Sequence, residues 1–125
     1  MSSAILEGRC ILVVEDDYMI AEDVRAELEE AGAIVAGPVP SVGQALQFLE
    51  SKPAPDAAVL DVNLGEGERS FRIAEALEAK AIPFLFATGY NSGDIPDEWR
   101  HRARIEVKPL QLAAIERLLV TRDAA

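Results

Sequence analysis

Two patterns of apolar residues alternate along the chain. One is a short, largely apolar run that predicts a strand buried in a sheet, and the other is an apolar stripe with helical spacing. The runs lie at residues 10–14, 33–39, 57–60, 83–88 and 104–107, and the stripes at 20–31, 41–49, 71–77 and 110–118, with about two turns of helix expected around Trp99. This alternation predicts an α/β protein with a five-stranded, doubly wound parallel sheet.

Polar residues stand where four of the predicted strands end. Glu15 and Asp16 follow the first strand, Asp61 the third, Thr88 the fourth and Lys108 the fifth. Because the carboxyl ends of parallel strands meet at one edge of the sheet, where ligands bind, we expect three carboxylates, a hydroxyl and an ammonium group to share one crevice.

Carboxylates held this close repel one another unless a cation neutralises them. Oxygen ligands in a partly open site favour Mg²⁺, which commonly sits beside a phosphoryl group. The ammonium of Lys108 and the hydroxyl of Thr88 would contact phosphoryl oxygens that the metal does not cover. The strand ends therefore predict a Mg²⁺-dependent phosphoryl-transfer site.

Length, charge and cysteine content limit the number of domains, the kinds of partner and the possible disulfides. The chain has 125 residues, an ordinary size for one domain, and a formal net charge of −10, which disfavours nucleic acid or an anionic membrane as the main partner. Cys10 is its single cysteine, so no disulfide forms within the chain. No leader or membrane-spanning run is recognised, and we expect a cytoplasmic protein.

The ordered set of strand-end residues, completed by Pro109 after Lys108, resembles the receiver domain of bacterial response regulators. The resemblance covers nearly the whole chain and implies the flavodoxin-like strand order 2-1-3-4-5. It implies that Asp61 accepts a phosphoryl group from the phosphohistidine of a histidine kinase or histidine phosphotransfer protein. It also implies Mg²⁺ ligands from Glu15, Asp16, Asp61 and the backbone carbonyl of Asn63, with Thr88 and Lys108 contacting the phosphoryl oxygens.

One position departs from the family. Receivers usually carry an aromatic residue three positions before the lysine, where this chain has Ile105. The motif at Phe86 to Tyr90, FATGY, resembles that of the FATGUY subgroup, which lacks this aromatic and often stands alone. We therefore expect a single receiver domain over residues 1–125 without an output domain, and a phosphorylation-dependent loop that includes Gly89 and Tyr90.

This resemblance predicts a signalling protein, monomeric or weakly dimeric, that assists its own phosphotransfer and dephosphorylation but is not an enzyme. In the family the first helix often contacts the donor, and here its acidic face would tune recognition. Two alternatives stay open: a small Mg²⁺-dependent phosphohydrolase acting through an aspartyl-phosphate, and a docking module that is not phosphorylated. A flavodoxin-like nucleotide binder is disfavoured because no glycine-rich phosphate loop follows the first strand.

Overall fold

The structure, a computed structural model, describes residues 3–51, 53–89 and 95–124. Strands and helices alternate through these residues, as the apolar pattern predicts. The strands are β1 (Cys10–Val14), β2 (Ile34–Val39), β3 (Ala57–Asp61), β4 (Phe84–Thr88) and β5 (Arg104–Val107). The helices are α1 (Tyr18–Glu30), α2 (Val42–Ser51), α3 (Phe71–Ala79), α4 (Asp97–Arg100) and α5 (Leu112–Ala124). The helix expected around Trp99 is shorter than predicted.

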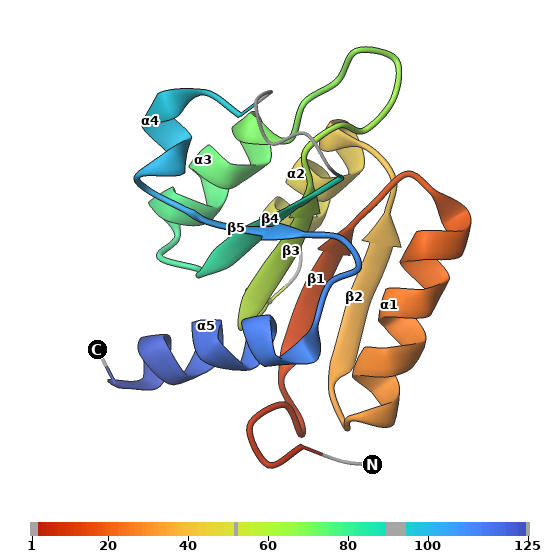
Figure 1. Cartoon of the computed structure of the whole chain (residues 1–125), viewed down its shortest axis with the longest axis vertical. Helices are drawn as coiled ribbons and strands as arrows, with labels where there is room; N and C mark the ends of the chain where they lie inside the picture. The colour runs from red at the N-terminus through yellow and green to blue at the C-terminus, as the bar shows by residue number, and fades with distance from the viewer. Residues whose placement is uncertain (1–2, 52, 90–94, 125) are drawn as a thin grey trace.

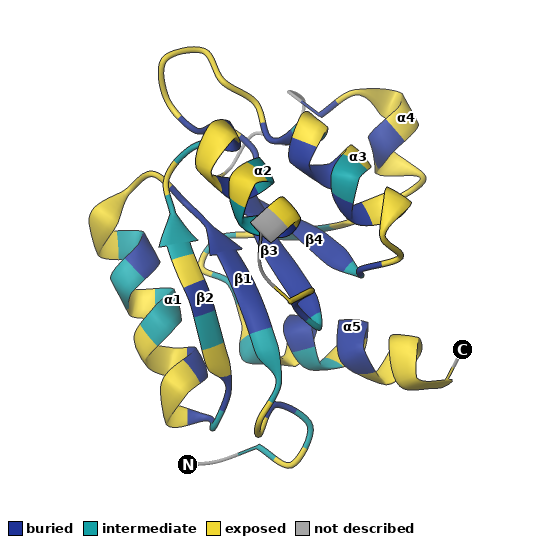
Figure 2. Cartoon of the chain, turned by 180° about the vertical axis from the view of Figure 1, so that it is seen from behind, coloured by how far each residue is buried: buried dark blue, intermediate teal, exposed yellow. Residues whose placement is uncertain are grey.

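The strands form one parallel sheet in the order β2-β1-β3-β4-β5, which confirms the predicted doubly wound topology. Helices α1 and α5 cover one face, and α2, α3 and α4 cover the other (Figure 1). Every residue of β3 and β4 is buried, whereas the edge strand β2 is largely exposed or half-buried (Figure 2). The central strands are therefore apolar at nearly every position, since helices pack on both of their faces.

Side-chain caps mark where two helices begin. The carboxylate of Asp17 accepts hydrogen bonds from the backbone N–H groups of Met19 (3.0 Å) and Ile20 (3.1 Å) at the start of α1. The hydroxyl of Ser41 accepts one from the N–H of Gln44 (3.2 Å) at the start of α2. These acceptors satisfy backbone donors that a helix leaves unpaired in its first turn. Asp17 is thus a helix cap, unlike the two acids before it.

Aromatic residues fill the core beneath α3 and α4. Trp99, 3% exposed, has ring centroids 6.2 Å from Phe71, 6.1 Å from Phe84 and 5.7 Å from Phe86. Ile105 pairs with Phe86 in the β4–β5 register and packs half-buried against this core. The short helix α4 is held in place mainly by burial of its tryptophan. No helix in the described ranges is both long enough and apolar enough to cross a bilayer.

Candidate functional site

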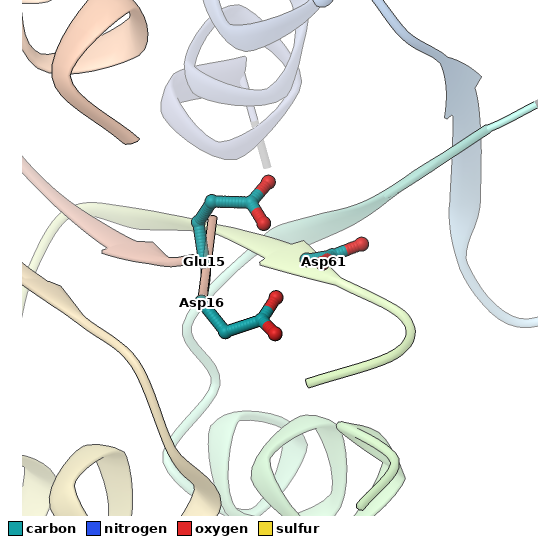
Figure 3. A group of neighbouring side chains, drawn as sticks. All are labelled: Glu15, Asp16 and Asp61. Atoms are coloured by element: carbon teal, nitrogen blue, oxygen red, sulfur yellow. The ribbon is translucent and has the colours of Figure 1, made fainter. Parts of the chain in front are cut away.

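Three carboxylates meet where β1 and β3 end. Glu15 and Asp16 directly follow β1, Asp61 is the last residue of β3, and the pairing of Val14 with Leu60 sets these two ends side by side. One oxygen from each carboxylate lies within 4.8 Å of the others. Glu15 and Asp16 extend above and below the end of β1, with both carboxylates on the side of Asp61 (Figure 3). The parallel topology thus brings the predicted acids together.

Lys108 directly follows the edge strand β5, and its side chain reaches the same cluster. Its Nζ atom lies 2.9 Å from Oε1 of Glu15 and 3.1 Å from Oδ1 of Asp61. Its backbone N–H donates to the carbonyl of Thr88 (2.7 Å), which continues the β4–β5 pairing beyond the end of β5. The lysine is therefore positioned by the sheet, and its ammonium group joins the two buried carboxylates.

Glu15 is the most constrained of the three acids. It is 7% exposed, its backbone N–H donates to the carbonyl of Val39 (3.0 Å), and its Oε2 accepts from the N–H of Asp17 (3.2 Å). Both of its carboxylate oxygens therefore have hydrogen-bond donors within the protein. Asp16, in contrast, is exposed, and among the described residues no cation or hydrogen-bond donor holds its carboxylate.

Burial makes the charge of Asp61 costly. Asp61 is 9% exposed, and burial, together with the neighbouring Glu15 carboxylate, raises its pKa to about 7 against the opposing effect of Lys108. Burial alone would lower the pKa of Lys108, but its hydrogen bonds and charge interactions with Glu15 and Asp61 outweigh that effect and raise it. The lysine therefore stays charged, while Asp61 retains a proton at a pH where an ordinary aspartate has lost it.

The donor set fits a hard divalent cation. Three ionised carboxylates and one ammonium group leave two more negative than positive charges in the cluster, which a dication would balance. Carboxylate and carbonyl oxygens are the ligands that Mg²⁺ prefers. Asn63 pairs with Arg69 in an isolated antiparallel bridge, and in the described part of the chain its carbonyl accepts no backbone hydrogen bond. The predicted role of that oxygen as a further ligand stays a prediction.

Thr88 and Gly89 lie at the same edge. Thr88 ends β4 and is 4% exposed, one residue beyond the Ala87 that pairs with Asp61. Gly89 is exposed and its φ lies outside the left-handed region, and a Cβ there would meet no atom of the described residues within 4 Å. Tyr90 lies outside the described residues, and its predicted role stays a prediction.

A groove beside the cluster was not predicted from the sequence. It has a volume of ≈ 520 Å³ and runs between α1 and the segment 108–110 that follows β5, with Glu15, Asp61 and Lys108 among its lining residues. Its walls also include apolar Val24 and acidic Glu27 of α1. No local sequence signal marks such a groove, because its shape depends on how α1 and a segment far from it in sequence pack on the sheet.

Several known proteins are similar to this chain in structure or in sequence. No protein-family model matches the chain. The solution structure of SdrG from Sphingomonas melonis Fr1 is 37% identical, covers 94% of this chain and 97% of its own, and superposes with a TM-score of 0.75. A BeF3-activated conformation of SdrG, 37% identical and covering 96% of this chain and 97% of its own, superposes with a TM-score of 0.72.

Two further relatives are similar to this chain, and the first of them is named as a response regulator receiver protein. A response regulator receiver protein from Sinorhizobium medicae WSM419 is 25% identical, covers 93% of this chain and 98% of its own, and has a TM-score of 0.74. The phyllosphere-induced regulator PhyR of Methylorubrum extorquens is 26% identical over 110 residues, 87% of this chain, which spans only 41% of PhyR. The likeness to SdrG is also consistent with the FATGUY motif at residues 86–90. Fold, strand-end residues and relatives agree that the chain belongs to the receiver domains of response regulators.

Proposed function

We propose that Asp61 accepts a phosphoryl group from the phosphohistidine of a partner protein. The observation that carries this proposal is the position of its carboxylate at the end of β3, where it accepts a hydrogen bond from the Lys108 ammonium (3.1 Å) and lies beside the carboxylates of Glu15 and Asp16. In the transfer, an Asp61 oxygen attacks phosphorus and the P–N bond breaks. The electron pair stays on the imidazole nitrogen of the donor.

The other residues supply position and charge, since phosphoryl transfer leaves the protein little covalent work. Asp16, Asp61 and the Asn63 carbonyl would hold Mg²⁺ directly, and Glu15 through water, because both Glu15 oxygens already accept hydrogen bonds. When bound, Mg²⁺ neutralises charge on the phosphoryl oxygens. Lys108 contributes a second positive charge there, and the Thr88 hydroxyl donates a hydrogen bond after the loop that follows β4 rearranges.

The partner would be a histidine kinase or a histidine phosphotransfer protein that approaches along α1. The groove between α1 and the segment 108–110 supports this route, because Asp61 lines it together with the acidic side chains of Asp23 and Glu27. A donor surface with positive charge would complement them. Charge reversal at Asp23 and Glu27 should therefore slow transfer from the protein donor and leave transfer from acetyl phosphate unchanged.

The proposed role is that of a stand-alone cytoplasmic response regulator that signals through protein contacts or relays phosphate. One comparison supports a role in phosphoryl signalling: SdrG has a BeF3-activated conformation, and BeF3 has the shape of a phosphoryl group. The receiver family is one of signalling modules, so we do not propose an enzyme. Phosphorylation would change which partner binds.

Intact-mass measurement tests the proposal. The wild type and two variants, Asp61→Asn and Asp97→Asn, are incubated with a phosphorylated histidine kinase or acetyl phosphate, with Mg²⁺ or EDTA. Asp97 is the matched control because its side chain is 96% exposed on α4. The wild type and Asp97→Asn should gain one phosphoryl group with Mg²⁺ only, and Asp61→Asn none.

Other outcomes separate the alternatives. Sustained turnover of small phosphate esters would identify a phosphohydrolase instead of a receiver. Failure of every donor to modify the wild type would leave only a docking module of the same fold. Modification of Asp61→Asn at an undiminished level would place the acceptor elsewhere.

A further inference from the structure

Gly65 lies close to the Asp16 carboxylate. A Cβ built on Gly65 would stand 2.9 Å from Oδ2 of Asp16, closer than real Cβ atoms approach other heavy atoms. Among the described residues no hydrogen bond or ion pair holds the Asp16 carboxylate in its place. Any side chain at position 65 therefore has to displace Asp16 or the loop.

The loop of residues 62–70, which contains Gly65, is held by backbone hydrogen bonds. It forms a small hairpin in which the Leu64 N–H donates to the Glu68 carbonyl (3.0 Å) and the Ser70 N–H donates to the Val62 carbonyl (3.1 Å). Val62 and Leu64 are buried in the core, at 1% and 5% exposure. A carboxylate oxygen of Glu68 also accepts from the Val42 N–H at the start of α2 (3.4 Å). Of the two groups that would clash, the exposed Asp16 carboxylate moves more easily than this anchored backbone.

The backbone at Gly65 favours glycine as it does at Gly67, and the approach to Asp16 is a second constraint that only Gly65 has. The Glu68 N–H donates to the Gly65 carbonyl (2.9 Å), so residues 65–68 make a tight turn whose central residues are Glu66 and Gly67. Both central residues have positive φ, 52° and 78°, as in a type I′ turn, which accounts for Gly67. Gly65 precedes them, and its own φ of 78° also favours glycine.

We infer that Gly65 is a positioning residue for the cation site: it leaves the space in which the Asp16 carboxylate joins Glu15 and Asp61. This inference rests on the proposed function, because it assumes that the cluster binds Mg²⁺. A Cβ on Gly65 would stand 2.9 Å from Oδ2 of Asp16. The Asp16 carboxylate is one of the three whose oxygens lie within 4.8 Å of one another (Figure 3). A displaced Asp16 removes one of the carboxylates from the cluster.

The test compares Gly65→Ala with Gly67→Ala. The two glycines have the same φ of 78° in one loop, but a Cβ on Gly67 would meet no atom within 4 Å in the described part of the chain. The pair therefore separates backbone strain from the contact with Asp16. Mg²⁺ affinity is measured by calorimetric titration, and folding by circular dichroism and urea unfolding. Gly65→Ala should bind Mg²⁺ about 10- to 100-fold more weakly than the wild type, and Gly67→Ala about as well as the wild type.

A second measurement needs no metal. If the clash is with the Asp16 carboxylate, the lowering of the urea midpoint by Gly65→Ala should shrink to that of Gly67→Ala in an Asp16→Ala background. This comparison holds even where Gly65→Ala alone is poorly folded. An unchanged lowering in that background would overturn the inference.

The outcomes distinguish this inference from the proposed function. Equal Mg²⁺ affinity in Gly65→Ala and Gly67→Ala would refute the role of Gly65 while the wild type still binds the cation. A wild type that binds no Mg²⁺ at millimolar concentration would refute both. Weaker binding in Gly65→Ala alone, with the loss of the stability difference in the Asp16→Ala background, is the result that we expect.

Discussion

Replacing Asp61 by asparagine should stabilise the metal-free protein at neutral and higher pH. Burial and Glu15 raise the pKa of Asp61 from an ordinary value of 3.8 to about 7. Between those two values the folded protein binds this proton and the unfolded chain does not. The free energy of unfolding of the wild type therefore falls as the pH rises through this window. The free energy of unfolding of Asp61→Asn does not fall in this way, because asparagine has no charge to bury.

The size of the effect follows from the shift. About three pKa units at about 1.4 kcal/mol each give a ceiling of about 4 kcal/mol above pH 7. The ammonium of Lys108 loses the acceptor that lies 3.1 Å away, which offsets part of the gain. We expect Asp61→Asn to exceed the wild type by about 1–3 kcal/mol near pH 8, and to differ little near pH 4.

Urea unfolding in EDTA measures this difference at about pH 4.5, 6 and 8, with far-UV circular dichroism and the fluorescence of Trp99 as probes. Asp97→Asn is the control, because its side chain is 96% exposed and its stability should track the wild type at each pH. Saturating Mg²⁺ should narrow the gap by stabilising the wild type. A variant less stable than the wild type near pH 8, or a gap independent of pH, would refute the electrostatic reasoning.

Three other replacements have predictable effects. Lys108→Met leaves two buried carboxylates without their ammonium partner. We therefore expect the free energy of unfolding of the metal-free protein, measured with urea, to fall by about 1–3 kcal/mol near pH 8 and by less near pH 5. Equal losses at the two pH values would contradict this reasoning. Trp99→Ala empties the space among three phenylalanine rings and should cost about 3–5 kcal/mol, followed by circular dichroism, whereas Trp99→Phe should cost less. Asp17→Ala removes the α1 cap and should cost about 1 kcal/mol, whereas Asp17→Asn should restore most of it; an alanine variant as stable as the wild type would exclude the cap.

Much of the fold was predictable from the sequence because its elements have strong local signals. The strands at 10–14 and 104–107 coincide with the predicted runs, and Asp17 and Ser41 begin helices with hydrogen bonds that their residue types favour. The helix around Trp99 was predicted too long. Its length depends on how one tryptophan packs between α3 and the sheet, which no local pattern specifies.

The apolar pattern along the chain shows which residues stand at the strand ends, and the rule that parallel strands end at one edge sufficed to predict that Glu15, Asp16, Asp61 and Lys108 meet. Packing in the folded chain sets how they meet. It places the lysine between two buried carboxylates, leaves Asp16 exposed, and brings Gly65 close to Asp16. Topology follows from periodic patterns along the chain, whereas distances of a few ångströms, burial and the resulting pKa of Asp61 arise from packing between segments far apart in sequence.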